Sequence, residues 1–277
     1  MDDRIVGEMI ARALKEDLGD AGDITSAATI PADKTMRASI VARQAGIVAG
    51  LPFAEAAFRA MDEQIELTRM TADGDALAPG DPVLTISGKA RAILSAERVA
   101  LNFLGHLSGI ATATRQLVDA VAGTGAAIVC TRKTTPGLRA AEKYAVRCGG
   151  GTNHRFGLYD AAMIKDNHVA AAGGVGPALK AARAQLGHLV KIEVEIDHLD
   201  QLDPALDGGA DVVMLDNMSI DDMKAAVEKT AGRAVLEASG NVTLKTVRAI
   251  AETGVDVISS GAITHSAPSL DLGLDVK

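Results

Sequence analysis

The second half of the sequence alternates short apolar runs with segments of helical spacing, and this alternation constrains the fold more than any other feature. Continuous apolar strands that alternate with helices predict a parallel sheet of βα units. Six such units within about 140 residues favour a barrel over an open sheet, although periodicity alone does not separate the two. The expected strands are Ala126–Thr131, Ala161–Lys165, Val190–Ile196, Val212–Leu215, Ala234–Ala238 and Val255–Ser259, and the expected helices include Gly174–Gln185, His198–Leu206, Ser219–Lys229 and Thr243–Glu252.

The first 90 residues have a mixed pattern that predicts a small α+β unit. Helices are expected at 3–18 and Pro52–Met61, and strands at Arg37–Val48, Ile65–Met70 and Pro82–Ser87. A long helical pattern follows from Ala92 to Val121. Glycines at 105 and 109 indicate either a break in that helix or close packing against it.

Composition excludes several classes of protein. A chain of 277 residues with 48% hydrophobic content supports one large domain or two smaller ones, and six aromatic residues imply an aliphatic core. A net charge of −8 argues against a nucleic-acid-binding protein. The spacing of Cys130 and Cys148 matches no zinc pattern and indicates a reduced, cytoplasmic enzyme, with Cys130 as a small core residue. No signal peptide or membrane span is expected.

Cations gather in one segment of this acidic chain. Residues 132–168 have a net charge of +4, against −8 for the whole chain. Turn residues interrupt the cations at Thr134–Gly137 and Gly149–Gly151, so they do not form one helical stripe. We therefore expect a pocket for a small, multiply charged anion rather than a solvated basic face, which is the commoner meaning of a charge cluster.

A polar residue stands at or beside the end of each expected strand. In a parallel barrel the carboxyl ends of all strands open on one face, so these side chains are expected to converge on one site. Single strands often end where polar loops begin, but six in register with complementary chemistry favour a site. The residues are Arg132 with Lys133, Lys165, Glu195, Asp216, Ser239 and Ser260.

The types of residue suggest a ligand with distinct ends. Small residues with available backbone N–H groups, at Ser239-Gly240 and Ser260-Gly261, are suited to a phosphate. Glu195 and Asp216 could bind Mg²⁺ and sugar hydroxyls, because that ion prefers oxygen ligands. The cations, with His154 beside Arg155 as a plausible anion contact, would face a carboxylate or pyrophosphate.

Ordered motifs along nearly the full length resemble the quinolinate phosphoribosyltransferase family. The chain departs from the common family pattern at Asn241, where a second glycine is frequent, but backbone N–H groups remain available there. The matching motifs are ALKEDLG (13–19), GDITS (22–26), ERVALNFL (97–104), TRKTTPGLR (131–139), GGGTNHR (149–155), IKDNH (164–168), EVE (193–195), LDN (215–217), EASGNVT (237–243) and ISSGAITHSAPSLDLGL (258–274).

The resemblance implies an N-terminal α/β sandwich-like domain and an incomplete, open α/β barrel. It places the first domain at 1–105 and the barrel at 106–268, and the tail 269–277 could pack back on the first domain. It also implies a homodimer with shared active sites and a cytoplasmic enzyme of NAD biosynthesis. The implied reaction joins quinolinate to 5-phosphoribosyl-1-pyrophosphate with Mg²⁺, and yields nicotinate mononucleotide, pyrophosphate and CO₂.

The family motifs also imply a role for each matching residue. Arg98 of the neighbouring subunit would bind the two carboxylates of quinolinate together with Arg132, His154, Arg155 and Lys165. Lys133 would contact the phosphoribosyl donor, and Glu195 and Asp216 would bind ribose hydroxyls and Mg²⁺. Lys133, Glu195 and Asp216 are thus the expected catalytic residues. The 5′-phosphate would lie on Ser239, Gly240, Ser260 and Gly261.

Three further cations of the basic segment have no assigned role in the site, and three other functions compete with the one implied. Lys143 and Arg147 are expected to be helix-face or partner-subunit charges, and Arg139 stays undecided. A phosphoribosyltransferase for another heterocycle, a Schiff-base aldolase that uses Lys165, and a phosphate or nucleotide sensor are the alternative functions.

Overall fold

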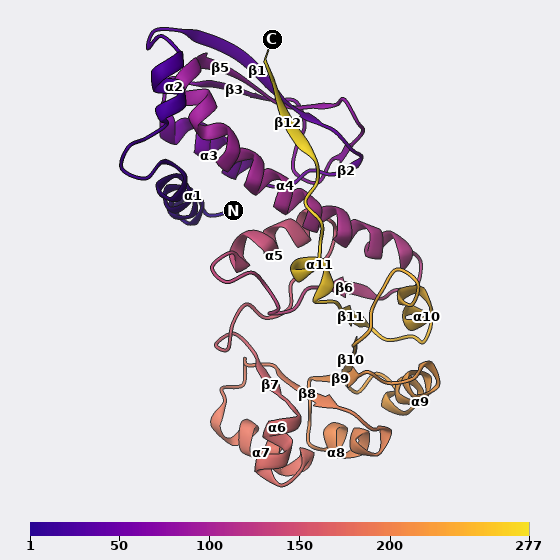
Figure 1. The fold of residues 1–277 in the computed structure, drawn as a ribbon. Helices are drawn as coiled ribbons and strands as arrows, with labels where there is room; N and C mark the ends of the chain where they lie inside the picture. The colour runs from indigo at the N-terminus through magenta and orange to yellow at the C-terminus, as the bar shows by residue number, and fades with distance from the viewer. Residues whose placement is uncertain (277) are drawn as a thin grey trace. The chain divides into compact units, whose positions relative to one another are not determined.

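The chain, described here by a computed structural model for residues 1–276, divides into two compact units (Figure 1). The first unit contains Met1–Ala113, Ala140–Gly150 and the segment that begins at Ala267, and the second contains Thr114–Arg139 and Gly151–Ser266. Contacts thus group residues 140–150 with the first unit, a grouping that the expected division into 1–105 and 106–268 does not include. None of the helices within residues 1–276 has the length and apolar character that crossing a membrane requires.

The first unit is built around a four-stranded antiparallel sheet in the order β12-β1-β5-β3. The expected strand at 37–48 is too long, because β1 ends at Ala42 and a separate strand pairs with β4. The N–H of Ile47 donates to the side chain of Thr112 (2.8 Å), which draws this stretch out of the larger sheet. The strands are β1 (Thr35–Ala42), β2 (Gly46–Ile47), β3 (Glu66–Arg69), β4 (Ala76–Leu77), β5 (Pro82–Lys89) and β12 (Leu272–Val276).

Helices of the first unit follow the apolar spacing of the sequence. The expected helix at 3–18 is confirmed, and the side chain of Asp2 accepts a hydrogen bond from the Arg4 N–H at its start. Phe53 and Phe103 stack with ring centroids 5.1 Å apart, so this aromatic pair joins α3 to α4. The helices are α1 (Asp3–Leu18), α2 (Ile24–Thr29), α3 (Leu51–Met61), α4 (Ala90–Ala120), which continues into the second unit, and α5 (Arg139–Cys148).

Helix α4 is unbroken over 31 residues, so its glycines serve close packing and not a break. A Cβ atom on Gly109 would lie 2.0 Å from the carbonyl oxygen of Pro268, and one on Gly105 would lie 3.0 Å from that of Leu270. The N–H of Leu270 donates to the carbonyl of Gly105 (2.9 Å). The chain leading into β12 therefore lies directly on this face of α4.

Helix α5 does not present Lys143 to solvent. The side chains of Lys143 and Glu142 are both fully buried, and Glu142 contacts Nε2 of His106 at 2.9 Å. The expectation that Lys143 is a helix-face charge is therefore wrong. Its neighbour in the sequence, Tyr144, donates a hydrogen bond to Asp73 (2.5 Å), which joins α5 to the loop before β4.

The second unit contains a six-stranded parallel sheet in the order β6-β11-β10-β9-β8-β7, and helices follow most of its strands (Figure 1). The six expected strands are confirmed, within about one to two residues at their ends. The strands are β6 (Ala127–Val129), β7 (Ala162–Ile164), β8 (Ile192–Ile196), β9 (Val212–Asp216), β10 (Val235–Ser239) and β11 (Val257–Ser259), and the helices are α6 (Asp166–Ala172), α7 (Val175–Gln185), η1 (Leu199–Gln201), α8 (Leu202–Asp207), α9 (Ile220–Thr230), α10 (Val247–Ala251) and α11 (Ala262–His265).

The parallel sheet forms an incomplete barrel. The first strand, β6, pairs with the last, β11, as in a barrel. On its other edge β6 gains a single parallel bridge from Val129 to Thr152. In residues 1–276 no ladder joins this bridge segment to β7, so the hydrogen-bonded ring stays open there. The expected combination of an N-terminal α/β domain with an open α/β barrel is confirmed.

Alternation along the strands separates two faces of the barrel wall. Val194, Val213 and Leu215 are fully buried on the face toward the helices. The residues between them point the other way, and the register brings Glu195 and Glu237 beside Met214, and Ser239 beside Asp216. The strands thus direct polar side chains from several positions to one interior face.

Candidate active site

A cavity of about 420 Å³ opens at the carboxyl ends of the parallel strands, and all of its lining residues belong to the second unit. Cations from the loops after β6 and β7 face carboxylates from β8, β9 and β10 across it. We call it the cationic cavity. It is lined by Thr131, Arg132, Lys133, His154, Arg155, Met163, Lys165, Glu195, Met214, Asp216, Glu237, Ser239 and Ser259.

A second cavity, of about 480 Å³, adjoins the first and is lined mainly by small and polar residues. We call it the serine–glycine cavity. Its own lining residues are Asn217, Gly240, Asn241, Val242, Thr243, Ser260, Gly261, Ala262 and His265. The two cavities share Thr131, Lys133, Asp216, Ser239 and Ser259.

The structure brings together all but one of the residues to which the sequence assigned a catalytic or binding role. The exception is Arg98, which is exposed on α4 in the first unit and lines neither cavity. The residues of the cationic cavity are Arg132, Lys133, His154, Arg155, Lys165, Glu195, Asp216 and Ser239, and those of the serine–glycine cavity include Gly240, Ser260 and Gly261.

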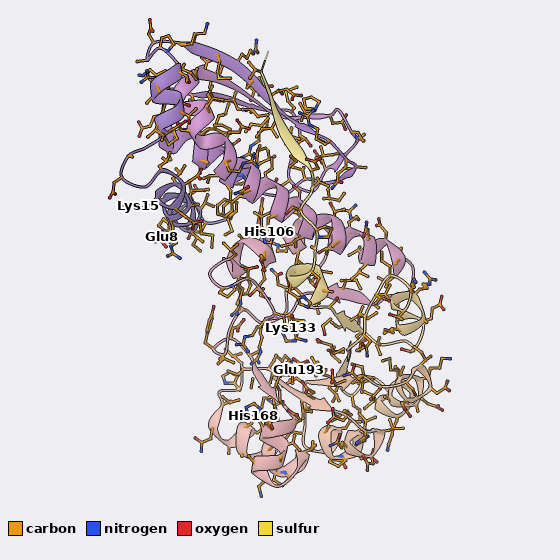
Figure 2. All side chains as sticks on the ribbon, viewed as in Figure 1. Glu8, Lys15, His106, Lys133, His168 and Glu193 are labelled. Carbon is orange, nitrogen blue, oxygen red and sulfur yellow. The ribbon has the colours of Figure 1, made fainter. Side chains whose placement is uncertain are left out.

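Lys133 lies at the junction of the two cavities, and its backbone is fixed at both polar groups. Its N–H donates to the hydroxyl of Thr131 (3.0 Å), and its carbonyl accepts from the hydroxyl of Thr264 (2.7 Å). A Cβ atom on Gly261 would lie 2.9 Å from Cδ of the lysine. Glycine at 261 therefore leaves room for the side chain of Lys133, which lines both cavities and is labelled in Figure 2.

Arg139, which the sequence left undecided, joins two loops of the site. Its Nε donates to the hydroxyl of Thr134 (3.0 Å), and one terminal nitrogen donates to the carbonyl of Phe156 (2.9 Å). These hydrogen bonds hold the loop after β6 against the segment that follows Arg155. Arg139 itself lines neither cavity, so its contacts are structural.

Arg155 enters the cationic cavity as a partly buried cation. One terminal nitrogen donates to the carbonyl of Ala161 (3.0 Å). Burial, together with the nearby charge of Arg132, lowers the pKa of the Arg155 guanidinium below its ordinary value. The Nε atom of Arg132 is itself buried and has no hydrogen-bond partner in the part of the chain that the structure describes. An anion placed between the two arginines would satisfy both groups.

The acidic residues of the cavity are already engaged with neighbours. Nζ of Lys165 lies 2.5 Å from Oε2 of Glu195, which links the end of β7 to β8. Oδ2 of Asp216 accepts from the side-chain amide of Asn217 (2.8 Å). Both carboxylates line the cationic cavity, and hard oxygen ligands of this kind suit Mg²⁺.

The loops after β9 and β10 have backbone conformations that require particular residues. Asn217 and Asn241 have φ values of 53° and 51°, and Gly240 has 93°. A Cβ atom on Gly240 would lie 2.1 Å from Oδ1 of Asn217. Asparagine is one of the side chains that tolerate the left-handed region, which explains how Asn241 can stand where family members often have glycine.

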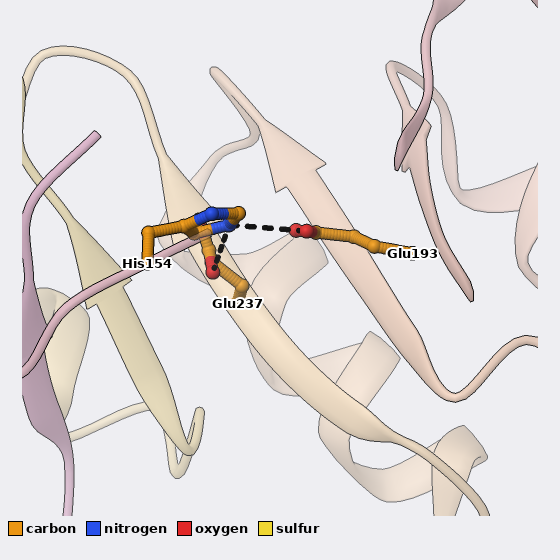
Figure 3. Close-up of side chains that lie close together, drawn as sticks. All are labelled: His154, Glu193 and Glu237. Carbon is orange, nitrogen blue, oxygen red and sulfur yellow. Dashed lines mark ion pairs between the residues drawn. The ribbon is translucent and has the colours of Figure 1, made fainter. Parts of the chain in front are cut away.

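His154 meets two buried carboxylates in the wall of the cationic cavity (Figure 3). Its Nε2 lies 3.0 Å from Oε2 of Glu193 and 3.5 Å from Oε2 of Glu237. Its Nδ1 accepts a hydrogen bond from the backbone N–H of Arg155 (2.8 Å). Both ring nitrogens of His154 are thus in contact with protein groups, and the three side chains form what we call the histidine–glutamate cluster.

The histidine–glutamate cluster retains a proton at neutral pH. Burial alone lowers the pKa of His154, but the hydrogen bonds and charges of Glu193 and Glu237 outweigh burial and raise that pKa to about 10. Burial also raises the pKa of Glu193, and the charge of Glu237 raises it further. Because Nδ1 accepts the Arg155 N–H, the imidazole carries one proton, on Nε2, and the additional proton that the raised pKa implies lies on the carboxylate side of the cluster, where burial raises the pKa of Glu193.

Sequence reasoning missed Glu193, Glu237 and Ser259 as site residues. The signal for the two glutamates was present, because a charged residue inside an otherwise apolar, fully covered strand is rarely buried without a partner. Ser259 lines both cavities, and its hydroxyl is buried without a hydrogen-bond partner among residues 1–276. Only its place one residue before Ser260 distinguished it in the sequence.

Comparison with known proteins identifies the family. Residues 23–108 match the model of the quinolinate phosphoribosyl transferase N-terminal domain, and residues 110–275 match that of its C-terminal domain. A probable nicotinate-nucleotide pyrophosphorylase [carboxylating] from Bacillus subtilis is 48% identical over 261 residues, which cover 94% of this chain and 90% of that protein.

Two further relatives cover almost the whole chain. The nicotinate-nucleotide pyrophosphorylase [carboxylating] of Mycobacterium leprae is 47% identical over 97% of this chain and 96% of its own length. The crystal structure of NadC from Streptococcus pyogenes matches with a TM-score of 0.96 and 41% identity, and covers 100% of this chain and 99% of that one. The chain therefore belongs to the quinolinate phosphoribosyltransferase family.

Proposed function

We propose that this chain transfers the phosphoribosyl group of 5-phosphoribosyl-1-pyrophosphate to quinolinate, with loss of CO₂, to give nicotinate mononucleotide for NAD synthesis. One observation supports this activity above all others: a cavity rich in cations continues into a cavity rich in small residues, with Lys133 at the junction. This order matches a reaction between a heterocyclic dicarboxylate and a sugar phosphate.

The cationic cavity is suited to the two carboxylates of quinolinate. Arg132 and Arg155 offer planar guanidinium groups for bidentate contacts, and Lys165 offers a compact charge. The buried, unpartnered Nε of Arg132 supports an anion in this place. Substrate carboxylates would compete with Glu195 for the Lys165 amine.

The serine–glycine cavity would hold the 5′-phosphate of the donor. Ser239, Gly240, Ser260 and Gly261 supply small side chains that leave the backbone open to a phosphate. Lys133, which lines both cavities, would contact the pyrophosphate or ribose between the two ends. The buried hydroxyl of Ser259 is a further candidate contact at this junction.

Glu195 and Asp216 would bind the ribose hydroxyls and Mg²⁺. Both are oxygen donors at the ends of neighbouring strands. In each carboxylate one oxygen contacts a protein neighbour, and the second oxygen would bind the ligand. When bound, Mg²⁺ would neutralise charge on the departing pyrophosphate. The two carboxylates would stabilise the positive charge that develops on the ribose as the bond to pyrophosphate breaks.

The chemistry requires no protein nucleophile. Attack of the pyridine nitrogen on the ribose carbon displaces pyrophosphate and forms a pyridinium. When the adjacent carboxylate departs as CO₂, the positive ring stabilises the electron pair left on the ring carbon, which then takes up a proton from water. The main task of the site is to bring two anionic reactants together in the right orientation. The ion pair of Lys165 with Glu195 favours a charged amine, which does not suit the Schiff-base alternative.

A homodimer would complete the site. Arg98 is exposed on α4 and lines neither cavity of its own chain, so we assign it to the active site of a partner subunit, as the family resemblance implies. We also place the enzyme in the cytoplasm, since Cys130 and Cys148 are not joined in a disulfide.

A direct assay tests the activity. The protein is mixed with quinolinate, the phosphoribosyl donor and Mg²⁺, and nicotinate mononucleotide and ¹⁴CO₂ from labelled quinolinate are measured. Substitution of nicotinate for quinolinate tests whether both carboxylates are needed, and the Lys133→Ala variant serves as the inactive control. Binding of the donor without product would favour a sensor, and turnover of another heterocycle alone would favour a different phosphoribosyltransferase.

A further inference from the structure

The two glutamates of the histidine–glutamate cluster have no part in the roles assigned above, yet both contact His154, and Glu237 itself lines the cationic cavity. We propose that Glu193 and Glu237 are positioning residues that fix the imidazole of His154, and that His154 in turn fixes Arg155 for binding a substrate carboxylate. The inference rests on the proposed function and deepens it, because it assigns His154 an indirect role in place of the expected direct contact with quinolinate.

Protein groups contact both ring nitrogens of His154, which is the first support for this proposal. Nε2 of His154 faces Glu193 at 3.0 Å and Glu237 at 3.5 Å, and Nδ1 accepts the Arg155 N–H at 2.8 Å. A ring whose two nitrogens are engaged in this way cannot donate to a substrate carboxylate without breaking one of these contacts. The same contacts fix the tautomer and the orientation of the ring, as carboxylate partners do for histidines in other sites.

The second support is the cost of placing two carboxylates in the barrel wall. Glu193 is 6% exposed and Glu237 is 3% exposed, and Oε1 of each has no hydrogen-bond partner within the described residues. Burying a carboxylate without full compensation is costly, so apolar residues at these strand positions would give a more stable barrel. We therefore attribute the two buried glutamates to the function of the active site and not to the stability of the fold.

The third support is the path from the cluster to the cavity. Glu193 lies on β8 and Glu237 on β10, so they contact the histidine from two strands with β9 between them. His154 is one residue before Arg155, whose guanidinium enters the cationic cavity and is held at its tip by the carbonyl of Ala161. The cluster thus fixes the backbone end of Arg155, while Ala161 fixes the other end.

The test measures Michaelis constants for the two substrates separately. Glu193→Gln and Glu237→Gln keep the side-chain size but remove the charge that orients the ring. A displaced Arg155 should raise the KM for quinolinate by roughly tenfold to a hundredfold and leave the KM for the phosphoribosyl donor within about twofold, because the donor binds elsewhere. Glu228→Gln, an exposed change of the same kind on α9, is the matched control and should match wild type.

A double-mutant cycle separates positioning from general loss of stability. If the glutamates act through the imidazole, Glu193→Gln should add little to the quinolinate KM of a His154→Gln variant, since residues in one network are not additive. Full additivity, or an equal rise in both KM values in a folded variant, would overturn the proposal. An unchanged quinolinate KM in both single variants would overturn it as well.

A measurement on the unaltered protein keeps the proposal testable even where a variant does not fold. In ¹⁵N NMR spectra, the His154 ring should show a slowly exchanging Nε2 proton and no titration between pH 5.5 and 8, with His154→Gln used for assignment where it folds. A ring that titrates near the ordinary histidine pKa of about 6.5 would overturn the inference.

Metal analysis tests whether a metal ion, instead of a proton, occupies the cluster. The three donor atoms lie within 4.8 Å of one another, a spacing that a metal ion could also bridge. One equivalent of tightly bound transition metal in purified wild-type protein would overturn the proton-based cluster. The NMR and metal measurements need no turnover, so their failure is distinct from a failure of the proposed activity, which the product assay reports.

Discussion

Nζ of Lys165 lies 2.5 Å from Oε2 of Glu195, an ion pair that joins the cationic and the acidic residues of one cavity. The side chain of Glu195 is only 11% exposed, whereas that of Lys165 is 45% exposed. The lysine is therefore the partner that can turn toward an incoming anion, and the glutamate is the one held in place. Binding of a substrate carboxylate would release Glu195 for the ribose and Mg²⁺ roles proposed for it.

Removal of the Lys165 amine should weaken quinolinate binding more than donor binding. We expect Lys165→Ala to lower kcat/KM for quinolinate by roughly a hundredfold, the cost of losing a charge-assisted contact in a partly desolvated site. Steady-state kinetics with each substrate varied in turn gives the measurement. Lys224→Ala, an exposed lysine on α9, is the control. An increase in the donor KM alone would place Lys165 at the wrong end of the site.

The sheet of the second unit was predictable from the sequence because its strands are buried and therefore form apolar runs. The six strands and the polar residues at their ends follow from this pattern alone. The split of residues 37–48 was not predictable, because it depends on the side chain of Thr112, which is 65 residues from Ile47. The burial of Lys143 on α5 likewise depends on tertiary packing that no local pattern reports.

The candidate site was predictable where a residue stands at a strand end, and less so where it lies inside a strand. Lys133, Glu195 and Asp216 were found in this way, with the family motifs to divide their roles. Glu193 and Glu237 sit within strands, and their meeting with His154 depends on a loop that returns from a distant part of the chain. Their partner could not be named before the fold was known.

Gly240 should tolerate no side chain. Its φ of 93° is unfavourable for any other residue, and an added Cβ would lie 2.1 Å from Oδ1 of Asn217. We expect Gly240→Ala to lower the free energy of unfolding by roughly 2–4 kcal/mol, the sum of backbone strain and a steric clash, and to raise the donor KM. Urea denaturation and kinetics provide the two readouts.

A second glycine separates these two causes. Gly232 has a φ of 76°, but an added Cβ would meet nothing within 4 Å. Gly232→Ala should therefore cost only roughly 1 kcal/mol, the strain of the left-handed backbone alone, and should leave both KM values unchanged. Equal destabilisation by the two alanines would show that the contact with Asn217 contributes nothing.

Shared active sites predict that two inactive variants restore activity when mixed. If Arg98 completes the site of the partner, a heterodimer of Arg98→Ala and Lys133→Ala subunits contains one intact site and one with both substitutions. Random reassortment would then restore about a quarter of wild-type activity. The two variants are unfolded and refolded together, or mixed under conditions that exchange subunits. Product formation is then followed over time. Mixtures that stay inactive after verified exchange would exclude sharing of Arg98.

The raised pKa of His154 predicts that stability falls at alkaline pH. A group whose pKa is higher in the folded state than its ordinary value of 6.5 stabilises the fold fully below pH 6.5, and the stabilisation is lost as pH rises toward about 10. The raised pKa of Glu193 has the same sign. Between pH 6.5 and 8.5 we expect the free energy of unfolding to fall by roughly 1–2 kcal/mol, after allowance for partial solvent screening.

This window isolates the cluster from the other shifted groups. Burial raises the pKa of Cys148 from 9.0 to about 11 and that of Tyr144 from 10.0 to a still higher value, so their contributions begin above pH 8.5. Urea midpoints at half-unit steps of pH give the slope. His154→Gln should flatten it, whereas His188→Gln, an exposed histidine, should keep it. A wild-type curve that is flat across the window would mean that the cluster loses its proton below neutral pH, and that the imidazole is not fixed by a shared charge.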